Sequence, residues 1–341
     1  MSADVDVLIV GAGHAGLGVA ARLKARGREA VVIEANEHVG DAWRERWPTL
    51  RLFTPRFMNV LPGAPFPQGA DPFPGKDEVA AYQERYASER DLDVRLGTRV
   101  ERVRPASGGF DVTLGGEILR ARNVVIANGA NQTPRVPTFA ARLDARVRQL
   151  HSRDYGTAGA LPPGPVLIVG ARNSGVEIAM DLADRHEVTL AIGATSTYAP
   201  ARWRGPRWWR LAQLRNWVLR GWEPPGPWPW PVKPPGGRWI EVDLPRVERE
   251  GRLRTAPRAV DASGDVVRFA GGSELRPRTV IWATGFRIDD SWIEVPQGDD
   301  GITVGRHRRG PVPGLWIHRA GLLASVYWGG RAIAEDILTT R

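Results

Sequence analysis

The chain of 341 residues contains no cysteine. This absence excludes disulfide bonds, thiolate metal ligands and the Cys-x-x-Cys redox pair of dithiol enzymes. No apolar run approaches the roughly 18 residues that a membrane-spanning helix needs. The N-terminus, Met-Ser-Ala-Asp-Val-Asp, lacks the basic start of a signal peptide. We therefore expect a cytoplasmic protein without dithiol chemistry.

Lysine is also scarce. Of the 47 basic residues, only three are lysine and the other 44 are arginine. The formal net charge is +9. A basic balance can indicate a nucleic-acid partner, but the chain carries no recognition motif of that kind. We attribute the arginine excess to compositional bias and expect no nucleic-acid partner. The length suggests about two domains.

A glycine-rich loop follows the first apolar run of the chain. Residues 5–10 precede Gly11-Ala12-Gly13-His14-Ala15-Gly16, and a helical stretch, 17–26, comes next. In such loops the glycines permit a tight turn, backbone approach to a pyrophosphate and close helix packing, and the helix N-terminus attracts phosphate. Glu34 ends the next strand about 20 residues later, where a carboxylate binds ribose hydroxyls. The pattern predicts an adenine dinucleotide, and a purely structural turn would leave Glu34 unexplained.

A second loop of this kind lies near the middle of the chain. The apolar run 166–169 precedes Gly170-Ala171-Arg172-Asn173-Ser174-Gly175, and the helical stretch 176–185 follows. Two such loops predict two dinucleotides with electrons passing from one to the other.

The second dinucleotide site departs from the pattern at two positions, one in the loop and one at the end of the next strand. Arg172 replaces the middle glycine, and Gly193 stands where an arginine would bind a 2′-phosphate or an acid a ribose. One missing charge-assisted phosphate contact costs about 1.5–3 kcal/mol, which would remove a preference for NADPH over NADH. Arg172 would either obstruct the diphosphate or bind it through its guanidinium, and Arg202 and Arg204 are alternative phosphate ligands. A working nicotinamide site and a vestigial one both remain open.

The alternation of apolar and helical segments predicts an α/β fold with two Rossmann-like domains. We expect an antiparallel meander over 98–121, buried strands at 123–127 and 279–283, and a last helix over 322–338. The nicotinamide-type domain is expected as an insertion into the first. The expected boundaries are 1–155 and 272–341 for the first domain and 156–271 for the second.

A stretch dense in Trp, Arg and Pro covers residues 199–240. Eight of the 14 tryptophans fall between Trp203 and Trp239. This composition is compatible with a roof over a hydrophobic substrate pocket, a membrane-interface helix or an ordinary packed subdomain.

The run from Gly40 to Pro55 resembles the stretch that follows the FAD ribose carboxylate in flavin-containing monooxygenases, especially short bacterial members and the plant auxin-forming branch. Shorter matches follow in order at residues 61–63, 72–74, 151–155, 283–286 and 321–325. Together they span nearly the whole chain except about 195–260.

The resemblance implies FAD on the first loop, NADPH or NADH on the second, and O2-dependent monooxygenation of a small lipophilic sulfur, nitrogen or ketone compound through a flavin C4a-hydroperoxide. It implies that the residues at or near FAD, beyond the first loop, are Glu34, Ala35, Asp41, Trp43, Arg44, Val100, Ala127, Gly129, Leu322 and Leu323. The nicotinamide residues would be Gly170, Arg172, Asn173, Ser174 and Gly175. The alternative to a cofactor contact is core packing for Trp43 and a surface ion pair for Arg44.

No conventional acid–base pair or nucleophile triad is evident, so the expected reactive centre belongs to the cofactor. Phe53, Thr54 and Asn59 are the candidate catalytic residues. Phe53 lies in the region where longer family members place a flavin-facing asparagine; the alternative is that Phe53 is core and that Asn59 or Thr54 supplies the polar contact. His151 and Asp154 are expected to support the domain junction. An FAD oxidoreductase without oxygenation and a non-catalytic FAD-binding protein stay open as alternatives, as do a homodimer and a membrane-surface contact.

Overall fold

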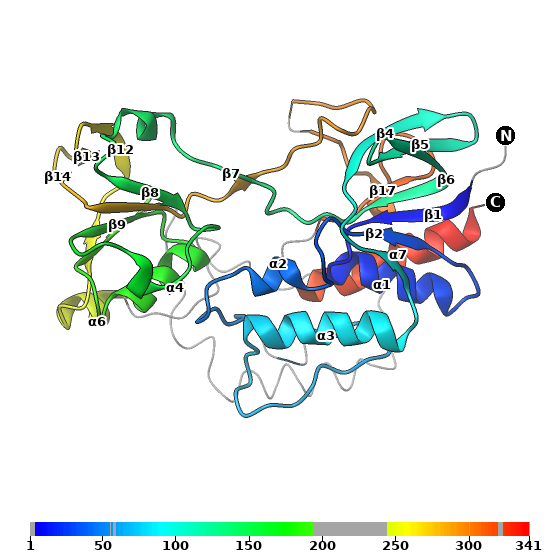
Figure 1. Ribbon diagram of the computed structural model, residues 1–341, viewed down its shortest axis with the longest axis horizontal. Helices are drawn as coiled ribbons and strands as arrows, with labels where there is room; N and C mark the ends of the chain where they lie inside the picture. The colour runs from blue at the N-terminus through cyan, green and yellow to red at the C-terminus, as the bar shows by residue number, and fades with distance from the viewer. Residues whose placement is uncertain are drawn as a thin grey trace. The chain divides into compact units, whose positions relative to one another are not determined.

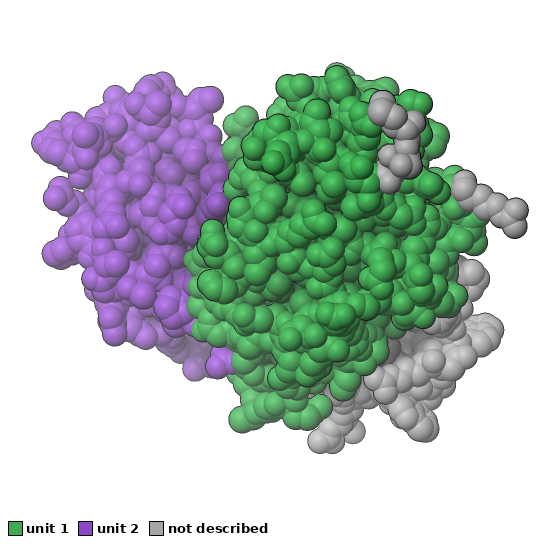
Figure 2. All heavy atoms as spheres, turned by 45° about the vertical axis from the view of Figure 1, so that its right-hand side comes forward, with its two compact units in different colours: residues 1–45, 54–133, 286–341 green, residues 46–53, 134–285 purple. Residues whose placement is uncertain are grey.

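The computed structural model describes residues 4–54, 56, 59–193, 244–299, 301–319 and 323–340 (Figure 1). The chain divides into two compact units, coloured separately in Figure 2: unit 1 comprises residues 1–45, 54–133 and 286–341, and unit 2 comprises 46–53 and 134–285. The boundaries expected at 155/156 and 271/272 differ from this division. β8 (Arg148–His151), expected in the first domain, pairs with β15 (Thr279–Trp282) inside unit 2. The Trp-rich stretch 199–240 lies outside the described residues.

Unit 1 is built on a parallel sheet with the order β3-β2-β1-β6-β17 (Figure 1). The bounds are β1 (Val5–Val10), β2 (Val31–Ile33), β3 (Asp93–Arg95), β6 (Glu117–Ile126) and β17 (Leu315–Ile317). The first half of β6 also pairs with the antiparallel strand β5 (Gly109–Leu114), which in turn pairs with β4 (Val100–Ala106). The meander strand and the buried strand expected as separate elements are therefore one strand, β6.

The helices of unit 1 connect these strands. α1 (His14–Lys24) and α7 (Leu323–Thr339) pack side by side, and α2 (Asp41–Arg44) packs on α3 (Lys76–Glu89). Alternate residues of β1 are buried on opposite faces: Leu8 and Val10 lie in a cluster with residues of β5, while Val7 and Ile9 are fully buried on the other face. Cover on both faces is what a parallel sheet requires.

Unit 2 holds a second parallel sheet with the order β11-β10-β9-β15-β8. The remaining bounds are β9 (Val166–Val169), β10 (Val188–Ala191), β11 (Arg254–Ala256), α4 (Asn173–Leu182) and α6 (Leu244–Arg249). Ile168 and Ile281 pack with α4 and α6 on one face. Leu167 and Trp282 pack on the other face against an antiparallel layer of β12 (Ala259–Ser263), β13 (Val266–Phe269) and β14 (Glu274–Leu275). The predicted β-α-β segment around the second loop is confirmed.

The chain passes between the units four times: on both sides of residues 46–53, within β7 (Thr133–Pro134) and at the start of β16 (Phe286–Arg287). Within the described residues, no helix combines the length and the apolar character needed to cross a bilayer.

Candidate functional site

Two glycines of the first loop are required by the protein itself. Gly11 has φ +105°, and a Cβ there would lie 2.7 Å from the carbonyl oxygen of Ala127. A Cβ on Gly16 would overlap the carbonyl oxygen of Gly11. These residues allow α1 to start directly against the carboxyl edge of the sheet.

Gly13 differs from the other two glycines of the loop, Gly11 and Gly16. Its φ of −75° and ψ of −176° suit any residue, and a Cβ there would meet nothing within 4 Å. The fold therefore does not need glycine at this position. The free space lies at the N-terminus of an 11-residue helix, where backbone N–H groups and the helix dipole favour an anion. This open cradle fits the diphosphate of FAD.

Replacing Gly13 by alanine is expected to leave the stability of the flavin-free protein unchanged and to weaken FAD binding by about ten- to a hundredfold, because the methyl group occupies only the ligand's space. Gly16→Ala is the matched control, and it should destabilise the flavin-free protein by about 1–3 kcal/mol through overpacking. Thermal unfolding and FAD titration measure both effects. Equal loss of stability in the two variants would contradict this assignment.

Glu34 joins the end of β2 to the first loop. Its Oε2 accepts a hydrogen bond from Ala12 N at 2.7 Å, and its Oε1 accepts one from Asn36 N at 3.0 Å. A carboxylate has further lone pairs for ribose hydroxyls. Thr98 N donates to Glu34 O at 2.9 Å, so the segment that begins β4 at Val100 passes beside this end of β2. Ala35 is exposed next to Glu34.

The side chain of His14 faces the protein interior. It is 4% exposed, and its Nε2 lies 3.3 Å from Val60 O. Burial lowers the pKa of His14 to about 4, so the imidazole is neutral at pH 7. Within the loop, His14 and the half-exposed Ala15 therefore present backbone rather than charge to a ligand.

Arg44 ties α2 to α3. Its Nη1 donates to Asp41 Oδ1 at 2.9 Å and to Val39 O at 2.8 Å, and its Nη2 donates to Glu84 Oε2 at 2.6 Å. These contacts agree with the ion-pair interpretation of Arg44, and they hold Asp41 as well. Trp43, which lies between Asp41 and Arg44 in the sequence, is half-buried. A cofactor contact of these residues stays a prediction.

The residues after β6 and β17 meet at the carboxyl edge of the first sheet. Ala127 N donates to Val10 O at 2.8 Å, and Gly129 O accepts from Gln132 Nε2 at 2.9 Å. Between them, Asn128 Oδ1 accepts from Arg319 Nε at 2.9 Å. Leu322 lies outside the described residues, and Leu323 begins α7.

Arg319 also pairs with a buried carboxylate. Its Nη2 lies 2.5 Å from Asp290 Oδ1, and the two side chains are 6% and 7% exposed. Neither residue belongs to a sequence motif, and nothing in the sequence predicts that the two meet. The pair fixes the segment that leads into α7.

Thr54 and Asn59 bind each other. Thr54 Oγ1 donates to Asn59 Oδ1 at 2.7 Å, and Asn59 Nδ2 donates to Thr54 O at 2.9 Å. Both are buried in unit 1. Phe53 packs against the hydrophobic cluster of unit 2 that contains Ala171, as its core interpretation expects. A catalytic role of the three residues stays a prediction.

The second loop repeats the backbone pattern of the first. Gly170 N donates to Ala191 O at 3.1 Å, as Gly11 N does to Ile33 O at 2.8 Å. Gly170 has φ +110°, and a Cβ on Gly175 would overlap the carbonyl oxygen of Gly170. Asn173 and Ser174 begin α4 and are half-buried. The outer glycines are thus retained for the same steric reasons as in unit 1.

The described residues at the ribose end of the second site carry no charge. Because Ala191 takes the place of Ile33 in the pattern, Ile192 rather than Gly193 corresponds to Glu34. Gly193 is the next residue, and a Cβ there would meet nothing within 4 Å. Neither a carboxylate nor a guanidinium is present at these two positions.

His151 is held at both ring nitrogens. Its Nε2 donates to Gly285 O at 3.0 Å, and its Nδ1 accepts from Arg153 N at 3.1 Å. Burial lowers the pKa of this imidazole. It joins the ends of β8 and β15, which is a supporting role. Because these contacts lie within unit 2, the expected role of His151 and Asp154 at the domain junction stays a prediction.

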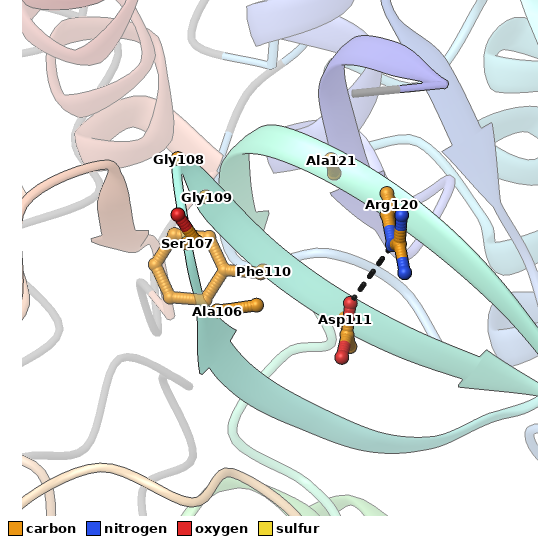
Figure 3. Close-up of a pocket in the computed structure, with 8 residues that line it drawn as sticks. All are labelled: Ala106, Ser107, Gly108, Gly109, Phe110, Asp111, Arg120 and Ala121. Atoms are coloured by element: carbon orange, nitrogen blue, oxygen red, sulfur yellow. Dashed lines mark ion pairs between the residues drawn. The ribbon is translucent and has the colours of Figure 1, made fainter. Parts of the chain in front are cut away.

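A hollow of about 170 Å³ lies on the β4–β5 hairpin and the adjoining part of β6 (Figure 3). Asp111 and Arg120 pair across it at 3.5 Å. Its lining includes no residue of the two glycine loops, so it adds nothing to the dinucleotide site.

Comparison with known proteins identifies the family. The sequence profile described as pyridine nucleotide-disulphide oxidoreductase matches residues 8–204, which is more than half of the chain and includes both loops. The chain belongs to this family. This oxidoreductase is 33% identical to a Geobacillus kaustophilus protein named "Uncharacterized oxidoreductase CzcO-like", over 98% of each chain. It is 31% identical to indole-3-pyruvate monooxygenase YUCCA1 of Oryza sativa, over 92% of this chain and 84% of the relative.

A solved structure supports the same placement. The flavin-containing monooxygenase from Stenotrophomonas maltophilia is 25% identical, covers 99% of each chain and superposes with a TM-score of 0.82. The expected fold, family resemblance and class of flavin-dependent oxidoreductase are therefore confirmed. Since the sequence has no cysteine, this oxidoreductase cannot carry out the dithiol chemistry in the family's name.

Proposed function

We propose that this oxidoreductase is an FAD-dependent, NAD(P)H-using monooxygenase that acts on a small lipophilic sulfur, nitrogen or ketone compound. The repetition of one backbone pattern at two helix N-termini carries the proposal, because it provides one phosphate cradle in each unit. The similarity to monooxygenases over nearly the whole chain supports the oxygenating step.

The first loop and Glu34 would hold FAD, with its diphosphate in the space that Gly13 leaves open. When bound, FAD supplies the centre that takes hydride from the nicotinamide and reacts with O2. The second loop, through Asn173, Ser174 and the α4 N-terminus, would hold the nicotinamide coenzyme. Neutral His14 and the paired Thr54 and Asn59 bring no free charge to the first site.

Anaerobic mixing tests the proposal. The purified flavoprotein is mixed with NADH or NADPH without oxygen, and flavin absorbance is followed; both coenzymes are expected to bleach it. Air containing ¹⁸O2 is then admitted with a panel of sulfides, amines and ketones. One ¹⁸O atom in the product is the expected result.

Two outcomes contradict the proposal. If neither coenzyme at millimolar concentration bleaches the flavin, no hydride reaches it and the non-catalytic alternative holds. If the flavin is reduced but oxygen appears only as hydrogen peroxide with every compound tested, the oxidoreductase acts without oxygenation.

A further inference from the structure

Arg172 occupies the place of Gly13 without changing the loop. Its φ of −83° and ψ of −172° match the −75° and −176° of Gly13. Val176 N donates to Arg172 O at 3.0 Å, just as Leu17 N donates to Gly13 O at 3.0 Å. A Cβ at the position of Gly13 meets no protein atom within 4 Å. By this correspondence the Arg172 side chain leaves the loop outward, on the side where a diphosphate would lie.

No described neighbour of Arg172 compensates the charge of its guanidinium. The residue is exposed, and in the described part of the chain no carboxylate pairs with it. It stands at the N-cap of the ten-residue helix α4, where the helix dipole disfavours a cation unless an anion is bound. The two described residues at the ribose end of the same site, Ile192 and Gly193, carry no charge.

We propose that Arg172 anchors the diphosphate of the nicotinamide dinucleotide through its guanidinium, and that this site binds NAD and NADP forms with similar affinity. The inference rests on the proposed function for the identity of the ligand. A guanidinium binds phosphate oxygens in a bidentate manner. The β-carbon at position 172 takes up space that glycine would leave free, so the diphosphate depends less on backbone N–H groups and more on a side-chain charge.

Equilibrium binding of NAD⁺ and NADP⁺ to the oxidised holoenzyme tests the inference without turnover. For the wild type, the two dissociation constants should agree within about threefold and rise together with salt. Arg172→Ala should raise both by about tenfold or more, and Arg172→Lys should keep most of the affinity. Arg185→Ala is the matched control, because this exposed arginine follows the other end of α4 and should have less than a twofold effect.

Gly193→Arg tests the ribose end separately. A Cβ at Gly193 meets no atom within 4 Å, and a guanidinium at this position would face the 2′-phosphate, so the variant should bind NADP⁺ about tenfold more tightly than NAD⁺. Equal or tighter binding by Arg172→Ala would show that Arg172 is an obstruction and would overturn the inference, as would wild-type binding that differs by more than tenfold between the coenzymes. Failure of flavin reduction, with coenzyme binding that still depends on Arg172, would reject only the proposed function.

Discussion

Asp290→Ala is expected to lower the free energy of unfolding by about 3–5 kcal/mol, because it leaves the charge of Arg319 buried without a partner. The two side chains are 7% and 6% exposed, with Asp290 Oδ1 and Arg319 Nη2 2.5 Å apart. Asn128 Oδ1 accepts from Arg319 Nε, but a neutral amide does not compensate a full charge. Urea unfolding measures the loss.

Two further variants separate the charge from the packing. Asp289→Ala changes the neighbouring, exposed carboxylate, which binds Ser291 N and Oγ, and it should cost about 1 kcal/mol. The double variant Asp290→Leu with Arg319→Met removes both charges and should recover most of the stability. If Asp290→Ala unfolds no more easily than Asp289→Ala, the pair is not a buried ion pair in solution.

The position of this pair gives it a consequence for the cofactor. Asn128 lies between Ala127 and Gly129 at the carboxyl edge of the first sheet, where a dinucleotide crosses in folds of this type. Gln297 Nε2 also donates to Asp290 O at 2.9 Å, so the segment around Asp290 is tied down from a second side. Asp290→Ala should therefore weaken FAD binding as well as stability.

The features predicted from sequence are those with a local cause. Each glycine loop follows a short apolar run and precedes a helical period, so β1, α1, β9 and α4 were all predicted in the right order. β6 was predicted as two elements because its first half is a half-exposed antiparallel strand and its second half is buried in the parallel sheet. β8 was missed as a strand, since three of its four residues are polar or charged and it lies at a sheet edge.

Other site features depend on contacts between distant residues. Counting residues from each loop makes Gly193 the equivalent of Glu34. However, the second loop is one residue closer to the end of its next strand than the first loop is, because Gly170 N bonds to Ala191 O where Gly11 N bonds to Ile33 O. The residue equivalent to Glu34 is therefore Ile192. Asp290 and Arg319 have no shared motif, and only the packed structure brings them together. Spacing therefore predicts the two phosphate cradles, whereas the register of strands decides what stands at their ribose ends.

Acidification from pH 6.5 to about 4 is expected to destabilise unit 1 by about 3 kcal/mol for each of two buried imidazoles. Burial lowers the pKa of both His14 and His318 to about 4. His318 Nε2 donates to Val326 O at 3.0 Å, and among the described residues neither Nδ1 has a hydrogen-bond partner. Gly329 leaves room for the His318 ring, because a Cβ there would overlap it.

The sign follows from proton binding. Between pH 4 and 6.5 the unfolded chain binds protons at both residues and the folded chain does not, so this stability is complete above pH 6.5 and lost as the pH falls toward 4. The nearby charges that act on the rings are cationic: Arg22 acts on both, and Arg308 on His318. Arg22 is itself held by Gly18 O and Tyr327 O at 3.0 Å, so it cannot move away easily.

Urea unfolding at intervals between pH 7.5 and 4.5, together with histidine NMR titration, measures the effect. The wild type should keep the His14 and His318 imidazoles neutral at pH 5.5, and the His14→Gln, His318→Gln double variant should have a flatter pH dependence of stability. His38→Gln changes an exposed imidazole and should leave the slope unchanged. A wild-type stability that is constant from pH 6.5 to 4.5 would mean that water reaches these rings, and the packing of α1, β17 and α7 around them would then be looser than described.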